Sequence, residues 1–266
     1  MIGNRAMPLL NIYATIYLAF LYAPMVVLPL FSFNESSIAA FPIRGWTLRW
    51  YQDLLQDRSV LSALQSSVIV AITAAVASTG FGLLAAMGLT REAMPGRRLI
   101  LTVLMLPLLL PPLVLGLALL TLLHKVMGMQ LSYLTVILGH VVICLPYSIL
   151  VLLARFEGFD RSLEDASLDL GQNALQTFRR VTLPLVFPGV VASLLLASVI
   201  SFDEFLIAFF LSGTDPTLPM IIWRSLRFPA KLPLTLALGT SILVLTTSLV
   251  VLAEVYRRRQ AGGSLA

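Results

Sequence analysis

Charged residues are scarce in this sequence. They make up 12% of its 266 residues, whereas 58% are hydrophobic and the mean hydropathy is +0.93. A water-soluble domain of this composition could not cover its surface with polar groups. The scarcity of charge therefore predicts a membrane protein surrounded by a lipid bilayer.

The residues that build most enzyme sites are also rare. Neither Lys125 nor Lys231, the two lysines, lies in a G-x-x-x-x-G-K-[ST] loop, so the chain lacks this loop for ATP. The two histidines and the one cysteine form no H-E-x-x-H or C-x-x-C pattern, and no G-x-S-x-G is present. We therefore expect a non-enzyme with no catalytic residue, no metal site and no cofactor.

The excess of positive charge is dispersed along the chain. The net charge is +5 and the pI is near 9.7, but the basic residues are scattered between apolar runs and form no single stripe. This pattern argues against nucleic acid as a partner.

Six apolar segments are long enough to cross a bilayer, whose hydrocarbon core of about 30 Å needs roughly 20 residues in a helix. The sequence thus predicts an all-α polytopic fold with one transmembrane domain over residues 1–266. The first segment has no small-residue cleavage pattern, so we expect it to be retained. The expected spans are residues 12–33, 66–89, 99–123, 133–154, 185–211 and 234–256.

The distribution of Arg and Lys predicts the orientation, because cytoplasmic loops carry an excess of both. The N-terminus, the even-numbered connections and the C-terminal tail hold Arg5, Arg91, Arg97, Arg98, Arg155, Arg161, Arg179, Arg180, Arg257, Arg258 and Arg259. The opposite side holds Arg44, Arg49, Arg58, Lys125, Arg224, Arg227 and Lys231. We therefore expect both termini in the cytoplasm.

The first outer connection, residues 34–65, is rich in aromatic residues. Trp46, Trp50 and Tyr51 alternate with polar residues, which is typical of an amphipathic segment at the membrane interface. An aromatic belt that anchors the neighbouring spans explains the same residues equally well.

The inner connection after the fourth segment, residues 155–184, predicts two short helices. Asp160 or Ser162 can cap the first helix, and Gly171 can end it in a left-handed conformation. Asn173 with Gln176 resembles a capping box for the second helix, which Pro184 is expected to end. The apolar residues at helical spacing are Leu163, Ala166 and Leu170, then Leu175, Phe178 and Val181.

This helix–turn–helix elbow has an apolar face that must be buried against something. It either packs on the inner ends of its own spans or enters a groove on a cytoplasmic partner. Patterning alone leaves both interpretations open.

The same stretch resembles the signature of inner-membrane permease subunits of type I ATP-binding-cassette importers. That family has E-E-A-A-x-x-L-G, then F-x-x-V-x-L-P and P-G, and every spacing agrees here. The departures are Asp165 in place of Glu and Ser167 in place of Ala. The matching residues are Glu164, Asp165, Ala166, Ser167, Leu170, Gly171, Phe178, Val181, Leu183, Pro184, Pro188 and Gly189.

The resemblance extends to most of the chain, including Phe31–Asn34 and Trp50-Tyr51 in the outer loop and the prolines of the third segment. It implies a bacterial inner-membrane permease whose elbow couples to a cytoplasmic ATPase dimer. It further implies a second homologous permease, expected as a heterodimer, and a periplasmic or extracellular solute-binding protein. The residues implied in ATPase coupling are Glu164, Asp165, Ala166, Ser167, Leu170, Gly171, Phe178, Leu183 and Pro184.

Two adjacent acids, Asp203 and Glu204, lie within the fifth apolar segment. An ionised carboxylate facing lipid would cost several kcal/mol, so each must face a wet cavity, a cation or a partner subunit. Adjacent residues point about 100° apart on a helix, which favours different roles. We expect one of them on the substrate path, with Phe202 and Trp223 as aromatic candidates; pairing with an arginine of a sister subunit is the alternative.

The stretch Ser201–Arg227 resembles the permeases for spermidine and putrescine, and carboxylates with aromatic rings suit polyamines chemically. Similar permeases that carry an amino acid, GABA or an opine remain alternatives, as does an ion-coupled secondary carrier.

Two further features are ambiguous. Pro107, Pro111, Pro112 and Pro146 mark either packing kinks or gates, and His140 is either a path residue or hydrogen-bonded to a neighbouring helix.

Overall fold

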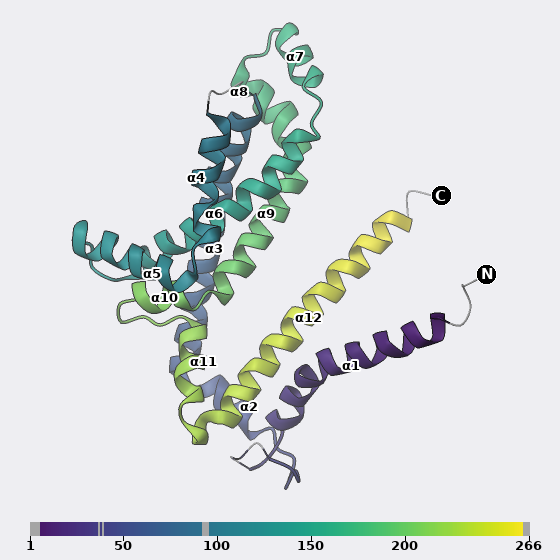
Figure 1. Ribbon diagram of the computed structural model, residues 1–266, viewed down its shortest axis with the longest axis vertical. Coiled ribbons are helices and arrows are strands. Elements are labelled where there is room, and N and C mark those ends of the chain that lie inside the picture. Colours follow the sequence, from purple (N-terminus) through teal and green to yellow (C-terminus); the bar gives the residue numbers. More distant parts are fainter. Residues whose placement is uncertain (1–5, 37, 39, 92–95, 263–266) are drawn as a thin grey trace. The chain divides into compact units, whose positions relative to one another are not determined.

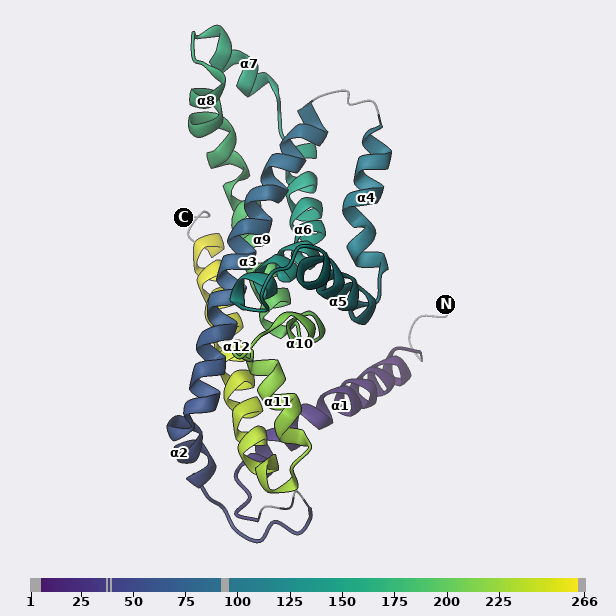
Figure 2. The same ribbon diagram turned by 90° about the vertical axis from the view of Figure 1, so that its left-hand side faces the viewer.

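The structure, a computed structural model, describes residues 6–36, 38, 40–91 and 96–262. Arg5 and residues 92–95 of the second connection lie outside the described residues. Throughout the described part of the chain the regular elements are helices, which confirms the all-α class (Figures 1 and 2). The chain divides into two compact units, Met1–Leu61 with Ile222–Ala266 and Ser62–Ile221.

The unit Ser62–Ile221 contains most of the helices, two of which, α3 and α11, continue into the other unit. It has two π-helical segments, η1 (Thr121–Val126) and η2 (Phe178–Thr182). The α-helices are α3 (Arg58–Arg91), α4 (Arg97–Leu109), α5 (Pro112–Leu120), α6 (Tyr133–Glu157), α7 (Ser162–Asp169), α8 (Ala174–Thr177), α9 (Leu183–Asp203), α10 (Leu206–Leu211) and α11 (Leu218–Leu226).

Small polar side chains join α3, α6 and α9 inside this unit. His140 Nδ1 lies 2.7 Å from Ser201 Oγ, which confirms a hydrogen bond between His140 and a neighbouring helix. The hydroxyls of Thr79 and Ser193 lie 3.0 Å apart, and all four of these residues are buried. Such contacts satisfy polar groups where no water reaches them and allow the helices to approach closely.

The third apolar segment is divided into two helices at a bend of 102° between α4 and α5. Pro111 and Pro112 lack backbone donors, and Leu110, the residue before them, is extended with ψ 134°. A proline removes a helical hydrogen bond and disfavours helical geometry in the residue before it. The described residues therefore contain five helices long and apolar enough to cross a membrane, or six if this bent pair counts as one crossing.

The unit Met1–Leu61 with Ile222–Ala266 contains α1 (Ala6–Ser32), α2 (Arg49–Gln56), the short 3₁₀ helix η3 (Pro229–Lys231) and α12 (Leu232–Gly262). Aromatic residues fasten α2 to the end of α1. Trp50 Nε1 donates to Asn34 O at 2.8 Å, and Tyr51 Oη lies 2.6 Å from Ser32 Oγ. These two predicted interface residues thus have a structural role in addition to any contact with the membrane.

Close packing between α3 and α6 makes a testable prediction at Gly82. A Cβ added there would lie 2.9 Å from Ser148 Cβ and 3.2 Å from its backbone carbon, whereas one added at Gly80 meets nothing within 4 Å. We expect Gly82→Leu to lower the stability of the protein by about 1–3 kcal/mol through overpacking. Gly80→Leu, the matched control, should unfold in detergent at the wild-type temperature; equal effects of both substitutions would contradict the packing described.

Candidate functional site in the elbow between α6 and α9

The candidate site is the elbow, defined as residues 162–182, which comprises α7, the turn after it, α8 and η2. Both ribbon views place α7 and α8 at one end of the unit, beyond the ends of α3, α6 and α9 (Figures 1 and 2). The elbow therefore lies at the end of the unit, where contacts within it and with the end of α3 maintain its shape.

The first helix of the elbow begins and ends as its sequence predicts. Asp160 Oδ1 accepts a hydrogen bond from the Ser162 backbone N–H at 3.0 Å. Hydrogen bonds from Ser162 lower the pKa of Asp160 below its ordinary value. A group with a lowered pKa contributes stability at neutral pH, and that contribution is lost as the pH falls through the lowered pKa. The Asp160 cap is therefore intact near neutral pH.

Gly171 terminates α7 in the left-handed conformation, with φ +84°. Its N–H donates to Leu168 O at 2.9 Å, and the Gln172 N–H donates to Ser167 O at 3.2 Å. This pair of bonds is the Schellman motif, which satisfies the last carbonyls of a helix. The prediction that Gly171 ends the first helix in a left-handed conformation is confirmed.

The second helix begins with the predicted capping box but does not end at Pro184. Asn173 Oδ1 accepts from the Gln176 N–H at 2.9 Å, and Gln176 Oε1 accepts from the Asn173 N–H at 3.1 Å. Beyond α8 the chain continues through η2 into α9, where Pro184 lies in the first turn. The Leu183 N–H donates to Phe178 O, five residues earlier, and such a widened turn accommodates a proline within a helix. The expectation that Pro184 ends this helix is therefore wrong.

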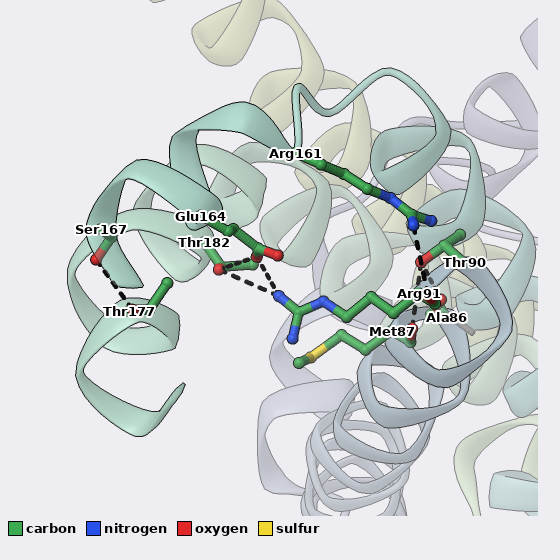
Figure 3. A network of polar contacts seen from close by, with 9 residues as sticks. All are labelled: Ala86, Met87, Thr90, Arg91, Arg161, Glu164, Ser167, Thr177 and Thr182. Atoms are coloured by element: carbon green, nitrogen blue, oxygen red, sulfur yellow. Dashed lines mark hydrogen bonds and ion pairs between the residues drawn. The ribbon is translucent and has the colours of Figure 1, made fainter. Parts of the chain in front are cut away.

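Polar side chains on the inner side of the elbow hold its parts together (Figure 3). The Arg91 guanidinium, at the end of α3, pairs with the Glu164 carboxylate, which also accepts from the Thr182 hydroxyl. The hydroxyls of Ser167 and Thr177 lie 2.9 Å apart and join α7 to α8. Ser167, Thr177 and Thr182 are buried.

The outer side of the elbow exposes apolar side chains instead. Leu170 is 85% exposed and Leu175 is 66% exposed, while Leu163 and Leu168 are each 46% exposed. Ala166 is exposed as well, and Phe178 and Val181 are partly buried. The elbow therefore buries hydroxyl groups and exposes leucine side chains, whereas an ordinary solvent-facing surface does the reverse.

The second place of interest is the break between α9 and α10, which divides the fifth apolar segment. Asp203 is the last residue of α9, and Glu204 is extended with ψ 113°. Glu204 Oε1 accepts from the backbone N–H groups of Leu206 and Ile207 at 2.9 and 3.1 Å, and so caps α10. The continuous helix expected through this pair is therefore wrong.

The remaining predicted path residues are distributed over both units. The Asp203 side chain is exposed and makes no hydrogen bond or ion pair to any described residue, and Phe202 beside it is partly buried. Trp223 belongs to the other unit, where the Arg227 guanidinium lies 5.8 Å from its ring centroid. The cap at Glu204 could not be predicted, because in the sequence an acid before a short apolar helix looks like any other acid within a span.

The fold and the elbow define a helical, multi-span membrane protein with an apolar surface outside its spans. Residues 78–262 match the model of the family described as "Binding-protein-dependent transport system inner membrane component", and the chain belongs to this family. It is therefore a multi-pass inner-membrane permease subunit of an ATP-binding-cassette importer and not an enzyme. The family implies an ATPase and a solute-binding protein as the other components.

Named relatives cover most of the chain. It is 38% identical over 234 residues to the putrescine transport system permease protein PotI of Escherichia coli (strain K12), which spans 84% of this chain and 82% of that protein. It is 32% identical over 250 residues to the spermidine/putrescine transport system permease protein PotC of Haemophilus influenzae (strain ATCC 51907 / DSM 11121 / KW20 / Rd). This alignment covers 94% of the present chain and 96% of PotC.

Solved structures share the fold. A chain of a bacterial ABC transporter involved in the import of the acidic polysaccharide alginate aligns with a TM-score of 0.75 at 16% identity, over 95% of this chain and 98% of that one. A chain from the complex of a bacterial alginate ABC transporter with its alginate pentasaccharide-bound periplasmic protein aligns with a TM-score of 0.72 at 18% identity. This alignment covers 93% of the present chain and 91% of the other. Both similarities bear on the architecture alone.

The turn at Gly171 predicts a purely backbone effect of substitution. A Cβ there would meet nothing within 4 Å, so the cost of Gly171→Val comes from its φ of +84° and is about 1–2 kcal/mol. We expect faster hydrogen exchange of the elbow amides in this variant, measured by mass spectrometry. In Gly171→Asn the exchange rates should stay closer to those of the wild type, because asparagine tolerates the left-handed region better than valine. Identical exchange in all three proteins would contradict the left-handed conformation at this position.

Proposed function

We propose that the elbow is the surface on which the ATPase docks, and that it faces the cytoplasm together with both chain termini. The observation that carries this proposal is the exposed apolar surface centred on Leu170, outside the spans and at the end of the unit. An exposed leucine surface on short helices is suited to a groove on a partner. The excess of arginine on this side supports the orientation.

The coupling residues divide into two groups. Asp165, Ala166, Leu170 and Gly171 are exposed and available for contact with the ATPase. Glu164 and Ser167 turn inward and hold the elbow together. Phe178, Leu183 and Pro184 lie where the elbow becomes α9. A movement of the docked elbow would therefore be transmitted directly into a membrane-spanning helix.

We propose that the solute is a small cation with more than one amine, such as putrescine or spermidine. The relatives named above are permeases of putrescine and spermidine/putrescine transport systems, and they match most of this chain. Asp203, with an exposed carboxylate at a break in α9–α10, is our candidate for the group that meets an ammonium. Phe202 can supply a ring face for cation–π contact, whereas the Trp223 ring, our other aromatic candidate on the path, already has the Arg227 guanidinium over it.

We further propose that the importer contains a second, homologous permease, so that the pair is a heterodimer on an ATPase dimer. Each permease would present one elbow to one ATPase subunit. The solute-binding protein would deliver the polyamine from the opposite side of the membrane.

Docking through Leu170 is tested by Leu170→Asp. We expect about a hundredfold weaker association with the ATPase, because an apolar contact is lost and a carboxylate is buried without a partner. Co-purification from membranes and titration of the ATPase onto the permease in nanodiscs measure this. Leu170→Met, the matched control, keeps the apolar contact and should bind as wild type does; undiminished association of Leu170→Asp would refute the docking proposal.

The role of Asp203 is tested by Asp203→Asn in the assembled importer. We expect uptake of radiolabelled putrescine to fall by about tenfold, because a charge-assisted hydrogen bond to the ammonium is lost. Asp215→Asn removes an exposed acid outside the helices and serves as the control. Normal polyamine uptake by Asp203→Asn, or faster uptake of an amino acid or an opine than of putrescine by the unaltered importer, would overturn the proposed substrate.

A further inference from the structure

We propose that Arg91, Glu164 and Thr182 form a brace that fixes the elbow to α3 and holds α7 to η2 within the elbow, and that Glu164 serves transport as a positioning residue through this brace. The inference rests on the proposed docking of the ATPase to the elbow. It adds a second mechanical connection, to α3, beside the direct continuation of the elbow into α9.

Three helical elements, of which α3 is distant in sequence from the other two, converge at the brace (Figure 3). Arg91 is the last residue of α3, Glu164 is in the first turn of α7, and Thr182 is the last residue of η2. The Glu164 carboxylate receives both the Arg91 guanidinium and the Thr182 hydroxyl, and Arg91 Nη2 also lies 3.3 Å from Thr182 Oγ1. Every arm of this contact belongs to a different helical element.

The brace is partly protected from water, which distinguishes it from an ordinary surface ion pair. The Glu164 side chain is 13% exposed and that of Arg91 is 34% exposed, and Thr182 is fully buried. For comparison, the Arg97–Glu157 pair has a separation of 3.4 Å, with side chains 43% and 59% exposed. Exposed pairs contribute little, whereas a charge-assisted contact with several hydrogen bonds is stronger.

Both charges also agree with the helices that carry them. A cation is favoured at the C-terminal end of a helix, where Arg91 lies, and an anion at the N-terminal end, where Glu164 lies. The Arg161 guanidinium donates to the backbone carbonyl of Arg91 at 3.4 Å, which gives a further contact between the start of the elbow and α3. Without the brace, the elbow would keep its covalent link to α9 but lose its main side-chain connection to α3.

The expected consequence is loss of coupling rather than loss of docking. In Glu164→Gln the exposed leucines remain available, so the ATPase still binds and hydrolyses ATP. Movement of the elbow would then be transmitted to α9 but not to α3. ATP would still be hydrolysed, but less solute would be imported for each ATP. The diagnostic quantity is the number of ATP molecules hydrolysed per solute imported.

The test uses the complete importer in proteoliposomes with putrescine, and compares Glu164→Gln and Arg91→Gln with wild type. We expect the amount of bound ATPase and its hydrolysis rate to stay within about twofold, and uptake to fall about five- to tenfold, as for loss of a charge-assisted contact. The charge-exchange double variant Arg91→Glu/Glu164→Arg should recover part of the uptake lost in Glu164→Gln, because the ion pair is restored although each charge then opposes its helix dipole. Glu157→Gln, which breaks the exposed Arg97–Glu157 pair, should leave the number of ATP molecules hydrolysed per solute imported unchanged.

Three outcomes separate this proposal from the docking proposal on which it rests. An unchanged ratio in Glu164→Gln, while Leu170→Asp abolishes association, overturns the brace alone. Loss of association in Glu164→Gln without recovery in the charge exchange identifies a docking contact and also overturns it. Intact association of Leu170→Asp overturns the docking proposal instead. If Glu164→Gln fails to accumulate in membranes, Thr182→Val tests the same contact with nearly unchanged side-chain volume, and a wild-type ratio there overturns the brace.

Discussion

The absence of water in the bilayer is the constraint on which the structure depends, because every polar group there must find its partner within the protein. The chain meets this requirement differently at each irregular point. Glu204 supplies the acceptor for two N–H groups where α9 gives way to α10. Between α6 and α9, His140 Nδ1 pairs with Ser201 Oγ, while His140 Nε2 is buried without a partner among the described residues. The break between α9 and α10 is thus a defined position with its own hydrogen bonds.

The elbow shows the reverse distribution of polar and apolar side chains. Its hydroxyls, Ser167, Thr177 and Thr182, are buried within it, and its leucines face outward. A short helix pair has too little interior to bury apolar side chains, so polar contacts and caps define its shape. This arrangement leaves the apolar surface exposed while internal hydrogen bonds hold α7, α8 and η2 together.

Local signals in the sequence were sufficient for much of this site. Gly171 and the Asn173–Gln176 capping box were predicted because their effects act over two to five residues. The continuation past Pro184 was not predicted, since it depends on the widened turn at η2, for which no composition is diagnostic. The contact of Arg91 with Glu164 joins residues 73 positions apart and could not be predicted without the fold. The same applies to the bend of the third segment, whose prolines indicated a kink but not its angle.

Both acidic pairs of the chain show the same division of roles. In Glu164-Asp165 the first acid turns inward to Arg91 and the second is exposed. In Asp203-Glu204 the second acid caps α10 and the first is left without a partner among the described residues. Neighbouring side chains leave the backbone in different directions, so one carboxylate can stabilise the local fold while its neighbour stays free. Glu164 and Glu204 hold the local backbone in place, and each thereby fixes the position of its exposed neighbour, Asp165 or Asp203. The two members of each pair should therefore not be interchangeable.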